Sequence, residues 1–295
     1  DKQSGLLTSY LYKKHEYILN GQGPRPFFWR APTDNDYGAN LPVRLKAWKE
    51  ASYQEPKAES FQVTPGSNAT TVKVTYRFPQ TEARWNITYK IYASGVIKVD
   101  NRFMAEGDQA PMIPRVGLRM QLPESFTDLT YYGRGPKENY RDRRTSQFIG
   151  EYAIPVKDMY EPYVRPQENN HRTDIYWCAL TDKTQRGLLL IADRTFELNA
   201  SNYPLESMDS GDTIDNGAPR TEKTHHRHLT DPLPEKMVDL FIDYRMMGVG
   251  GDDSWGATAH EPYLIRPGKE NAIEYGFSLV PFDKKEDYKY LIQQY

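Results

Sequence analysis

The sequence predicts an all-β fold of antiparallel strands, and three observations lead to that prediction. Apolar and polar residues alternate along several segments, turn-forming residues separate those segments, and only one short segment has a helical pattern. Alternation with a period of two is typical of half-buried antiparallel strands. Because the 295 residues contain no repeat and no Gly/Ser-rich linker, we expect a single large domain over residues 1–295.

The predicted elements follow in chain order. Residues 41–51 are expected to form a short helix, because Leu41, Leu45 and Trp48 make one apolar stripe and Pro42 stands near the start. The clearest strands carry apolar side chains at every second position, and they are Thr71–Phe78, Trp85–Tyr92, Arg115–Leu122, Met237–Tyr244 and Ala272–Val280. Between about residues 160 and 230 we expect long loops.

Charge and composition exclude several classes of function. The 38 basic and 40 acidic residues give a formal charge of −2 and form no basic stripe, so nucleic acid is not an expected partner. No apolar run reaches the roughly 18 residues of a membrane span, so no membrane partner is expected either. The single cysteine, Cys178, lies in the apolar run "DIYWCAL" and is expected to be a buried thiol.

Four loops mix aromatic residues, carboxylates or amides, and glycine or proline. They are "FFWRAPTDNDYG" (Phe27–Gly38), "YYGRGPKENYRDRR" (Tyr131–Arg144), "MYEPYVRPQENNHR" (Met159–Arg172) and "GVGGDDSWG" (Gly248–Gly256). Binding residues are found disproportionately on long loops that a rigid scaffold positions. These four loops are therefore the candidate functional segments.

The first loop contains Asp34, Asn35 and Asp36, whose spacing resembles the start of a calcium-binding loop. The glycine and the distant glutamate of such a loop do not fit here, so we expect no metal site. The simpler interpretation is that these side chains cap neighbouring backbone amides. Contacts with a ligand or with another domain stay open.

The last loop places three glycines before Asp252 and Asp253, with Trp255 following. Glycine permits positive φ and a close approach of the backbone. An indole after such a run can offer a flat face to a sugar, or it can pack under its own loop. Both interpretations stay open on the residues alone.

Two further segments carry polar side chains without defining a chemistry. In "KTHHRHL", His226 and His228 would share one face of a strand, where they could bind a metal or hydrogen-bond within a sheet. The amides and carboxylate of Met159–Arg172 suit the recognition of hydroxyl groups, or simply meet water. No G-x-S-x-G elbow and no marked pair of carboxylates occurs, so the residues alone name no catalytic centre.

Five motifs in order resemble the C-terminal, small-chain domain of lacZ-type β-galactosidases of glycoside hydrolase family 2. "RAPTDNDYG" resembles its R-A-P-x-D-N-D-x-G motif, and "GRGPKENYRDR" resembles its G-x-G-P-x-E-N-Y-x-D-R motif. "MYEPYVRPQEN", "THHRHL" and "MGVGGDDSW" are similar to its M-Y-x-P-Y-V-x-P-x-E-N, S-H-R-H-L and M-G-x-G-G-D-D-S-W segments. The matches extend from about residue 5 to residue 280.

The resemblance implies a β-supersandwich of antiparallel strands, galactose mutarotase-like, with at most one or two short helices. It also implies that the catalytic glutamates belong to a TIM barrel that precedes this domain and is absent from the chain. Magnesium and sodium are expected in that catalytic domain, and no cofactor is expected in this chain. The isolated chain is expected to be inactive on lactose.

The resemblance further implies two contributions to an active site shared with the barrel. Trp255 would form a wall against which a sugar stacks at the aglycone side, and Gly38 would begin a loop beside the site. Asp253 of the same motif as Trp255 is also expected to bind the substrate. The sequence after Gly38 is shorter than the family pattern, so we do not expect the loop's movement to carry over. The remaining motif residues are expected to be structural, and they are Arg30, Asp34, Asn35, Asp36, Gly135, Glu138, Asn139, Tyr140, Glu168, Asn169, His226 and His228. The stretch Tyr131–Arg144 is expected to brace the face on which Trp255 stands.

The parent is expected to be a retaining β-galactosidase, a homo-oligomer of the bacterial cytoplasm or periplasm. Its site would bind a β-galactoside or glucose, and the partner of this chain would be the preceding barrel domain or a large subunit. Two alternatives compete with this interpretation. One is a mutarotase-like aldose 1-epimerase that uses His171 and Glu168 as its acid–base pair. The other is a stand-alone carbohydrate-binding domain.

Overall fold

The computed structural model describes residues 1–105, 112–210, 228–266, 268, 272–283 and 286–294. Its strands are β1 Leu11–Tyr12, β2 His15–Glu16, β3 Arg25–Phe27, β4 Ala58–Thr64, β5 Ala69–Phe78, β6 Ala83–Tyr92, β7 Ile97–Ala105, β8 Arg115–Pro123, β9 Asp128–Gly135, β10 Phe148–Pro155, β11 Arg172–Thr181, β12 Gly187–Ser201, β13 Met237–Met246 and β14 Ile273–Phe282. Its helices are α1 Asp34–Gly38, α2 Leu41–Arg44, α3 Lys46–Tyr53, α4 Leu205–Met208 and α5 Tyr288–Ile292, with single 3₁₀ turns at Pro79–Thr81, Val156–Asp158 and Glu261–Tyr263.

Twelve of the described strands join one sheet in which every pairing is antiparallel. The main path runs β10-β9-β11-β12-β14-β7-β6-β5-β4. The sheet forks at the long strand β12, which pairs β14 with its first part and β13 with its last part. From β13 the second branch continues through β8 to β3.

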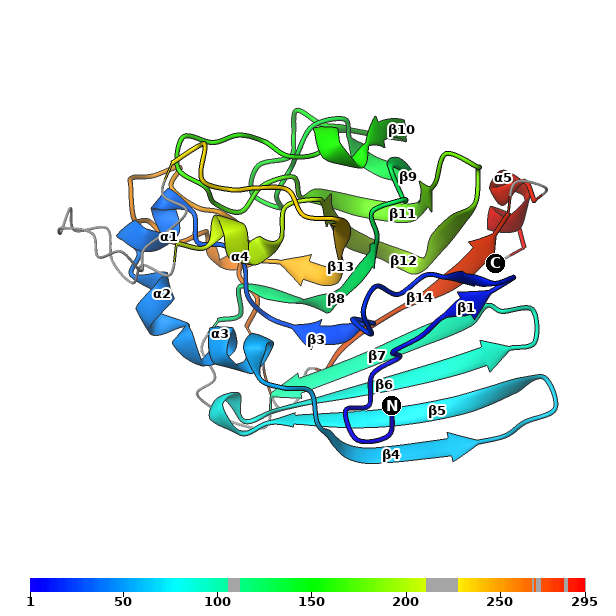
Figure 1. Ribbon diagram of the computed structural model, residues 1–295. Helices are drawn as coiled ribbons and strands as arrows, with labels where there is room; N and C mark the ends of the chain where they lie inside the picture. Colours follow the sequence, from blue (N-terminus) through cyan, green and yellow to red (C-terminus); the bar gives the residue numbers. More distant parts are fainter. Residues whose placement is uncertain (106–111, 211–227, 267, 269–271, 284–285, 295) are drawn as a thin grey trace.

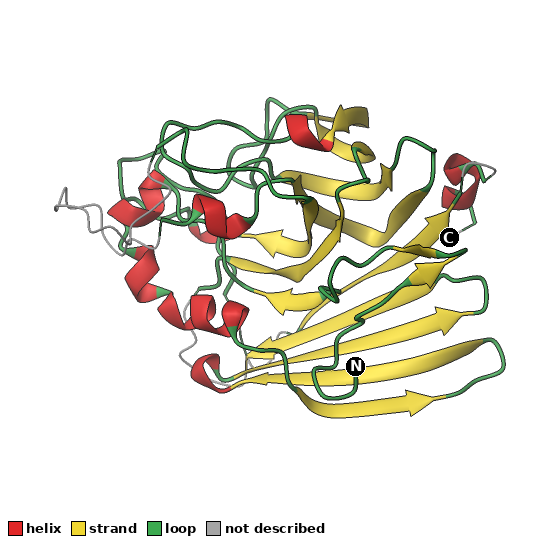
Figure 2. Ribbon diagram, viewed as in Figure 1, coloured by secondary structure: helices red, strands yellow, loops and turns green. Residues whose placement is uncertain are grey.

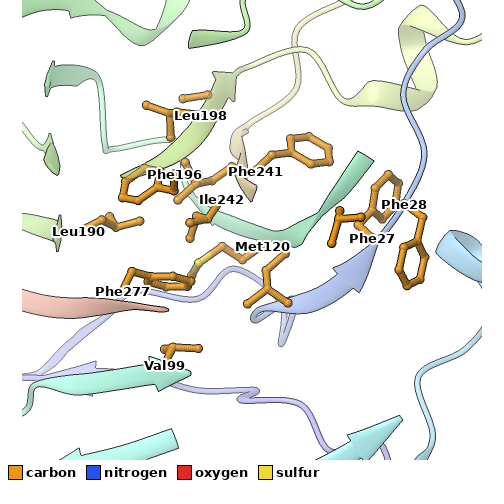
Figure 3. Close-up of a cluster of buried hydrophobic side chains, with 14 of the residues drawn as sticks. Phe27, Phe28, Val99, Met120, Leu190, Phe196, Leu198, Phe241, Ile242 and Phe277 are labelled. Carbon is orange, nitrogen blue, oxygen red and sulfur yellow. The ribbon is translucent and has the colours of Figure 1, made fainter. Parts of the chain in front are cut away.

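The branches stack as layers, as Figure 1 shows, with β4–β7 forming a broad lower layer and β9–β12 lying above β3, β8 and β13. Helices α1, α2 and α3 stand at one end of these layers, and the long loops gather above them, whereas α5 lies at the opposite end (Figure 2). Large apolar side chains from both branches meet in between. Figure 3 shows Phe28, Val99, Met120 and Phe277 in this core, each almost fully buried.

The predicted all-β antiparallel fold is confirmed, and so are the five strands predicted from alternation. The helical prediction needs correction, because the described residues hold five α-helices, each of eight residues or fewer, instead of one or two. The helix expected over residues 41–51 is interrupted at Leu45, whose φ of −111° and ψ of 16° leave the helical region. The others are single turns within loops, too short to give a periodic pattern. No described helix is long and apolar enough to cross a membrane.

Strands β8 and β13 are buried on both faces, although their alternation predicted one face in water. Their polar positions pair across the branch instead. Arg119 makes two 2.8 Å contacts with the carboxylate of Asp239, and Arg115 Nε lies 3.2 Å from Asp243 Oδ2. Buried charges need such partners. The polar face of the β8–β13 pair is therefore an internal layer rather than a surface. Cys178 is buried, as predicted.

Candidate functional site

All four candidate loops converge on one hollow of about 330 Å³. Its wall consists of Thr33, Asp34, Asn35, Tyr140, Arg143, Tyr163, Gln167, Glu168, Val249, Gly250, Gly251 and Trp255. These residues come from segments far apart in the chain, and each segment is one of the four loops that stood out by composition. Because the loops follow different strands of the forked sheet, the fold itself brings them together.

Trp255 stands on this hollow with 65% of its surface exposed. The interpretation that the indole packs under its own loop is therefore wrong. The backbone of its loop is nevertheless fixed by Asn35, which donates to Val249 O at 3.0 Å and to Ala257 O at 2.6 Å. Asn35 Oδ1 also accepts a hydrogen bond from the amide of Gly256 at 2.7 Å.

Two more side chains hold the start of the same loop. Asp142 accepts hydrogen bonds from the amides of Val249 at 3.0 Å and Gly250 at 2.8 Å. Buried Arg30 donates to Met247 O at 2.8 Å and to Gly248 O at 3.2 Å. The expectation that Tyr131–Arg144 braces the loop of Trp255 agrees with the contacts of Asp142.

The aspartates of the "DND" segment take part in helix capping and in ion pairs. Thr33 and Asp36 form a reciprocal capping box at the start of α1, and the Asp36 carboxylate also pairs with Arg30 at 2.8 and 3.0 Å. Asp34 is exposed, with Arg165 Nη1 3.3 Å from its Oδ1. The capping interpretation is therefore confirmed for Asp36, while Asp34 contacts Arg165 and Asn35 binds the backbone of the Trp255 loop.

Gly38 lies directly against the loop of Trp255. A Cβ atom at Gly38 would come within 2.8 Å of Gly256 Cα and 2.9 Å of Trp255 Cε2. Gly256 itself has a φ of +85°, which side-chain-bearing residues rarely adopt. Both glycines thus permit the close approach of two loops.

Glu138 connects the second and third loops on the other side of the hollow. Its carboxylate receives Arg143 Nη2 at 2.8 Å and the amide of Asn170 at 2.8 Å, and it accepts a short hydrogen bond from the hydroxyl of Tyr163. Burial, and next the hydrogen bond to Glu138, raise the pKa of Tyr163. The phenol therefore stays a neutral donor at the rim of the hollow.

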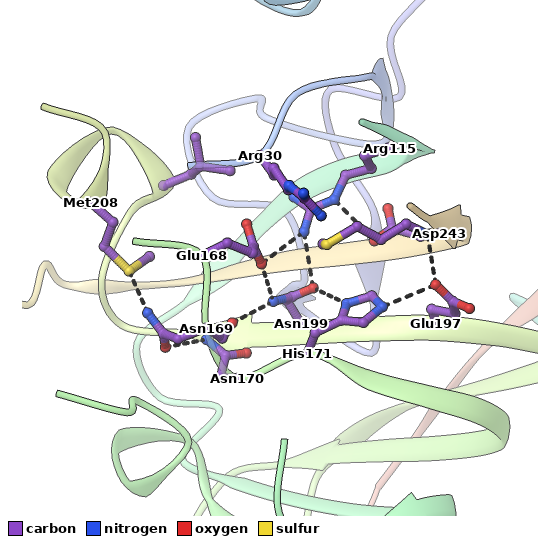
Figure 4. Close-up of polar contacts among 12 residues, drawn as sticks. Arg30, Arg115, Glu168, Asn169, Asn170, His171, Glu197, Asn199, Met208 and Asp243 are labelled. Carbon is purple, nitrogen blue, oxygen red and sulfur yellow. Dashed lines mark hydrogen bonds and ion pairs between the residues drawn. The ribbon is translucent and has the colours of Figure 1, made fainter. Parts of the chain in front are cut away.

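Glu168 of the hollow's wall belongs to a buried polar network, which Figure 4 shows. Glu168 Oε1 accepts from Arg115 at 3.1 Å and from Asn199 Nδ2 at 2.9 Å. His171 contacts Asn199 Oδ1 through Nδ1 at 2.7 Å and Glu197 Oε2 through Nε2 at 3.0 Å. The network joins β8, β12 and the third loop.

Glu197 is held as a carboxylate at the end of this network. Burial alone would raise the pKa of Glu197, but the single hydrogen bond with His171, the charge of Arg141 and the amide of Met246 together lower the pKa. The interpretation of His171 and Glu168 as an acid–base pair is not favoured by this geometry. His171 has no exposed surface and both of its ring nitrogens are hydrogen-bonded, and Glu168 is 4% exposed, with Oε1 held by Arg115 and Asn199.

The remaining motif residues of the described chain make the following contacts. Asn139 is buried, where its amide donates to Arg134 O and Lys137 O and accepts from Thr173. Tyr140 stacks on His171 with ring centroids 5.5 Å apart. Asn169 and Gly135 also lie within the packing, since Asn169 donates to Gln167 O and Met208 Sδ and Gly135 leaves no room for a Cβ beside Tyr131 and Tyr152.

The histidine segment gives no strand in the part of the chain that the structure describes. His226 lies outside the described residues. His228 lies in an exposed turn, where Asp231 Oδ2 accepts its amide at 2.9 Å and lies 3.4 Å from its ring Nδ1. The expectation of a shared strand face is therefore wrong for His228.

Asp253 lies on the exposed side of the Trp255 loop. Together with Asp252 and His260 it forms a group whose candidate ligand atoms lie within 4.8 Å of one another. The hydrogen bond to Asp252 raises the pKa of His260, so the imidazole favours its charged form beside the two carboxylates. This ion-pair arrangement accounts for the group without a metal.

Sequence reasoning missed several residues of the site. Glu197 and Asn199 are polar positions within the otherwise apolar segment "FELNAS" of β12, and an internal polar pair in a buried strand is a signal that could have found them. Asp142 was marked only as a member of the second family motif, and Tyr163 gave no such signal, because tyrosine is common in surface loops.

Comparison with known proteins places the chain in a family. The profile described as "Beta galactosidase small chain" matches residues 1–279. A β-galactosidase from Priestia megaterium is 34% identical over 90% of this chain and 24% of its own length, and one from Halalkalibacterium halodurans is 30% identical over 94% and 26%. Among solved structures, a GalM/aldose epimerase homologue from C. elegans is similar with a TM-score of 0.41 and 10% identity, over 94% of this chain and 79% of that one.

The chain spans about a quarter of the length of the two β-galactosidases. Since the profile covers nearly all of its residues, the chain belongs to the β-galactosidase small-chain family.

Proposed function

We propose that the chain is the C-terminal, small-chain domain of a lacZ-type, glycoside hydrolase family 2 β-galactosidase that hydrolyses terminal β-D-galactosides with retention. It would fold as one domain beside a TIM barrel, or a large subunit, that carries the two catalytic glutamates and the magnesium and sodium ions. The parent would be a homo-oligomer. Family membership and the fraction of the relatives' length that the chain spans support this proposal.

The observation that carries the proposal is the exposed, clamped indole of Trp255. Asn35 donates two hydrogen bonds to the loop of Trp255 and accepts one, and Asp142 accepts two more, yet 65% of the surface of Trp255 faces solvent. A sugar presents an apolar face of C–H groups that can lie on such a ring. By analogy with aromatic pairs, this contact contributes on the order of 1 kcal/mol.

Trp255 would act on the leaving or accepting sugar rather than on the bond that breaks. In a retaining glycosidase one carboxylate forms the galactosyl-enzyme and the other first protonates the leaving group and then activates the acceptor. The acceptor is water in hydrolysis and a sugar in transglycosylation. A platform on the aglycone side holds glucose in place, so it favours sugar over water as the acceptor. The chain itself would carry out no chemical step.

The test uses the full-length enzyme with Trp255→Ala. We expect the inhibition constant of glucose to rise, and the ratio of transglycosylation to hydrolysis to fall, each by up to about tenfold, since 1.4 kcal/mol corresponds to a factor of ten. The rate of galactosyl-enzyme formation from an activated aryl galactoside should change much less. Unchanged glucose inhibition and unchanged transfer would refute the platform.

Two control variants separate stacking from folding. Trp255→Phe retains a flat ring and should keep most of the glucose affinity. Tyr290→Ala removes an aromatic residue that is 61% exposed in α5, at the opposite end of the layers from α1, and should change neither readout. An equal loss in Tyr290→Ala would mean that the readouts follow general stability.

A further inference from the structure

A second and wider hollow, of about 850 Å³, lies at the fork of the sheet. Strand β12 pairs β14 up to Ala192 and β13 from Glu197 onward, and the residues between, 193–195, pair with no described strand. The branches diverge here and leave a groove, which we call the fork groove. It is lined by Asn86, Thr88, Asp100, Asn101, Arg102, Arg141, Asp193, Arg194, Thr195, Tyr244, Arg245, Ala272, Ile273, Glu274, Tyr275 and Gly276.

Each carboxylate of the fork groove already has a cation. Lys98 pairs with Asp193 in a short contact and lies 3.5 Å from Asp100, while Arg102 Nε lies 3.0 Å from Glu274. These pairs are local, between neighbouring strands β7, β12 and β14. They leave no acidic group of the groove free to neutralise a further arginine.

The groove has more arginines than these pairs use. Arg141 is engaged by Glu197 at 2.6 Å, but neither Arg194 nor Arg245 has a carboxylate within 4.0 Å among the described residues. The Nε of Arg245 is buried and makes no hydrogen bond in the described chain. A buried donor without an acceptor is costly, and the cost is larger for a charged group.

The charges around Arg245 also bear on whether an anion binds there. Burial lowers the pKa of Arg245, and the positive charge of Arg141 lowers the pKa further, with Arg144 adding a smaller repulsion. Tyr244 and Glu197 act the other way and raise the pKa, so Arg141 repels Arg245 at this end of the groove but part of that repulsion is offset. A bound anion would remove the repulsion and also give Arg245 Nε an acceptor.

We propose that the fork groove binds an oxyanion, meaning the carboxylate, phosphate or sulfate group of a small ligand, between Arg194, Arg245 and Arg141. A guanidinium presents paired N–H groups in a plane, which suits such groups better than a point charge would. The rings of Tyr244 and Tyr275 line the same groove and can pack against the rest of the ligand. This site differs from the hollow beside Trp255, and its ligand is charged where a galactoside is neutral.

The test measures binding of inorganic phosphate to the 295-residue chain by calorimetry at constant ionic strength. We expect saturable binding that weakens at least tenfold in Arg245→Gln and also weakens in Arg194→Gln. Because the side chain of Arg194 is exposed, its substitution should leave the fold intact. The matched control is Arg102→Gln, which removes an arginine of the same groove that is already paired and should retain the affinity within about twofold.

Further ligands identify the source of the oxyanion. Galacturonate that binds more tightly than phosphate and sulfate would support a sugar acid, whereas equal affinities would support an inorganic anion. Galactose, which lacks the charge, should not bind in the groove. Absence of saturable binding for every oxyanion, or an equal loss in Arg102→Gln and Arg245→Gln, would overturn the proposal.

Discussion

Asn35 is the residue whose removal should release the loop of Trp255. Its side chain makes three hydrogen bonds of 3.0, 2.6 and 2.7 Å to the backbone at Val249, Ala257 and Gly256. A typical hydrogen bond contributes about 1 kcal/mol net. Because the freed groups lie near the surface and can meet water, we expect Asn35→Ala to lower the free energy of loop opening by about 2 kcal/mol rather than the full sum.

Amide hydrogen exchange measures this opening directly. Under conditions where exchange reports the opening equilibrium, about 2 kcal/mol corresponds to roughly 30-fold faster exchange at Gly256, whose amide loses its acceptor. The amides of Val249 and Gly250 keep Asp142 and should accelerate less. Asn35→Asp retains the acceptor for Gly256 but loses both donors, so its exchange should lie between wild type and Asn35→Ala.

Two outcomes would contradict this reasoning. Exchange at Gly256 that stays within about threefold of wild type would mean that Asn35 does not control the loop. A uniform acceleration across the core strands would mean that Asn35 supports the whole fold. Only a local change, largest at Gly256, agrees with a clamp.

Two further predictions concern the buried charges. Burial raises the pKa of the Asp243 carboxyl from 3.8 to about 7, so between these pH values the folded chain holds a proton that the unfolded chain has released. The free energy of unfolding should fall by on the order of 4 kcal/mol as pH rises from about 4 to 7, and urea titrations of Asp243→Asn should lack this part of the fall. Arg119→Met leaves the Asp239 carboxylate buried without its cation, and denaturation should show a loss of about 3–5 kcal/mol, against less than about 1 for Arg102→Met, whose pair with Glu274 is exposed. Equal losses in the two variants would contradict the burial argument.

Strand positions were predictable because they depend on local sequence. In β5 and β6, the alternate residues Val74, Tyr76, Trp85 and Ile87 all point into the core, as a period of two requires. The short helices were not predictable in this way. A helix such as α1 depends on a capping box and tertiary contacts, and five residues are too few for any period.

Long-range pairing is what the sequence left open. Alternation in β8 and β13 predicted that Arg115, Arg119, Asp239 and Asp243 face water, whereas all four are buried in the interior. The register places Arg119 opposite Phe241 and Arg115 opposite Met246, so the charged side chains reach their partners diagonally across the two strands. The choice between a surface and an internal polar layer depends on which strand lies next to which. The same holds for the four loops, since composition marked each one and the family motifs placed only Trp255 and Gly38 beside a site, whereas the fold brings all four together.

In the loop of Trp255 the backbone is held by hydrogen bonds, whereas the indole side chain is left exposed, and this contrast bears on the function of the loop. Side chains from two distant segments, including Asn35 and Asp142, bind its backbone, while the indole remains largely exposed. A tryptophan that served only stability would gain most by being buried, because apolar surface contributes in proportion to the area removed from water. Ordering the loop instead costs conformational entropy before any ligand arrives. Such prior ordering lowers the cost of binding later, so the arrangement favours a ring held ready for a partner that lies outside this chain's own core.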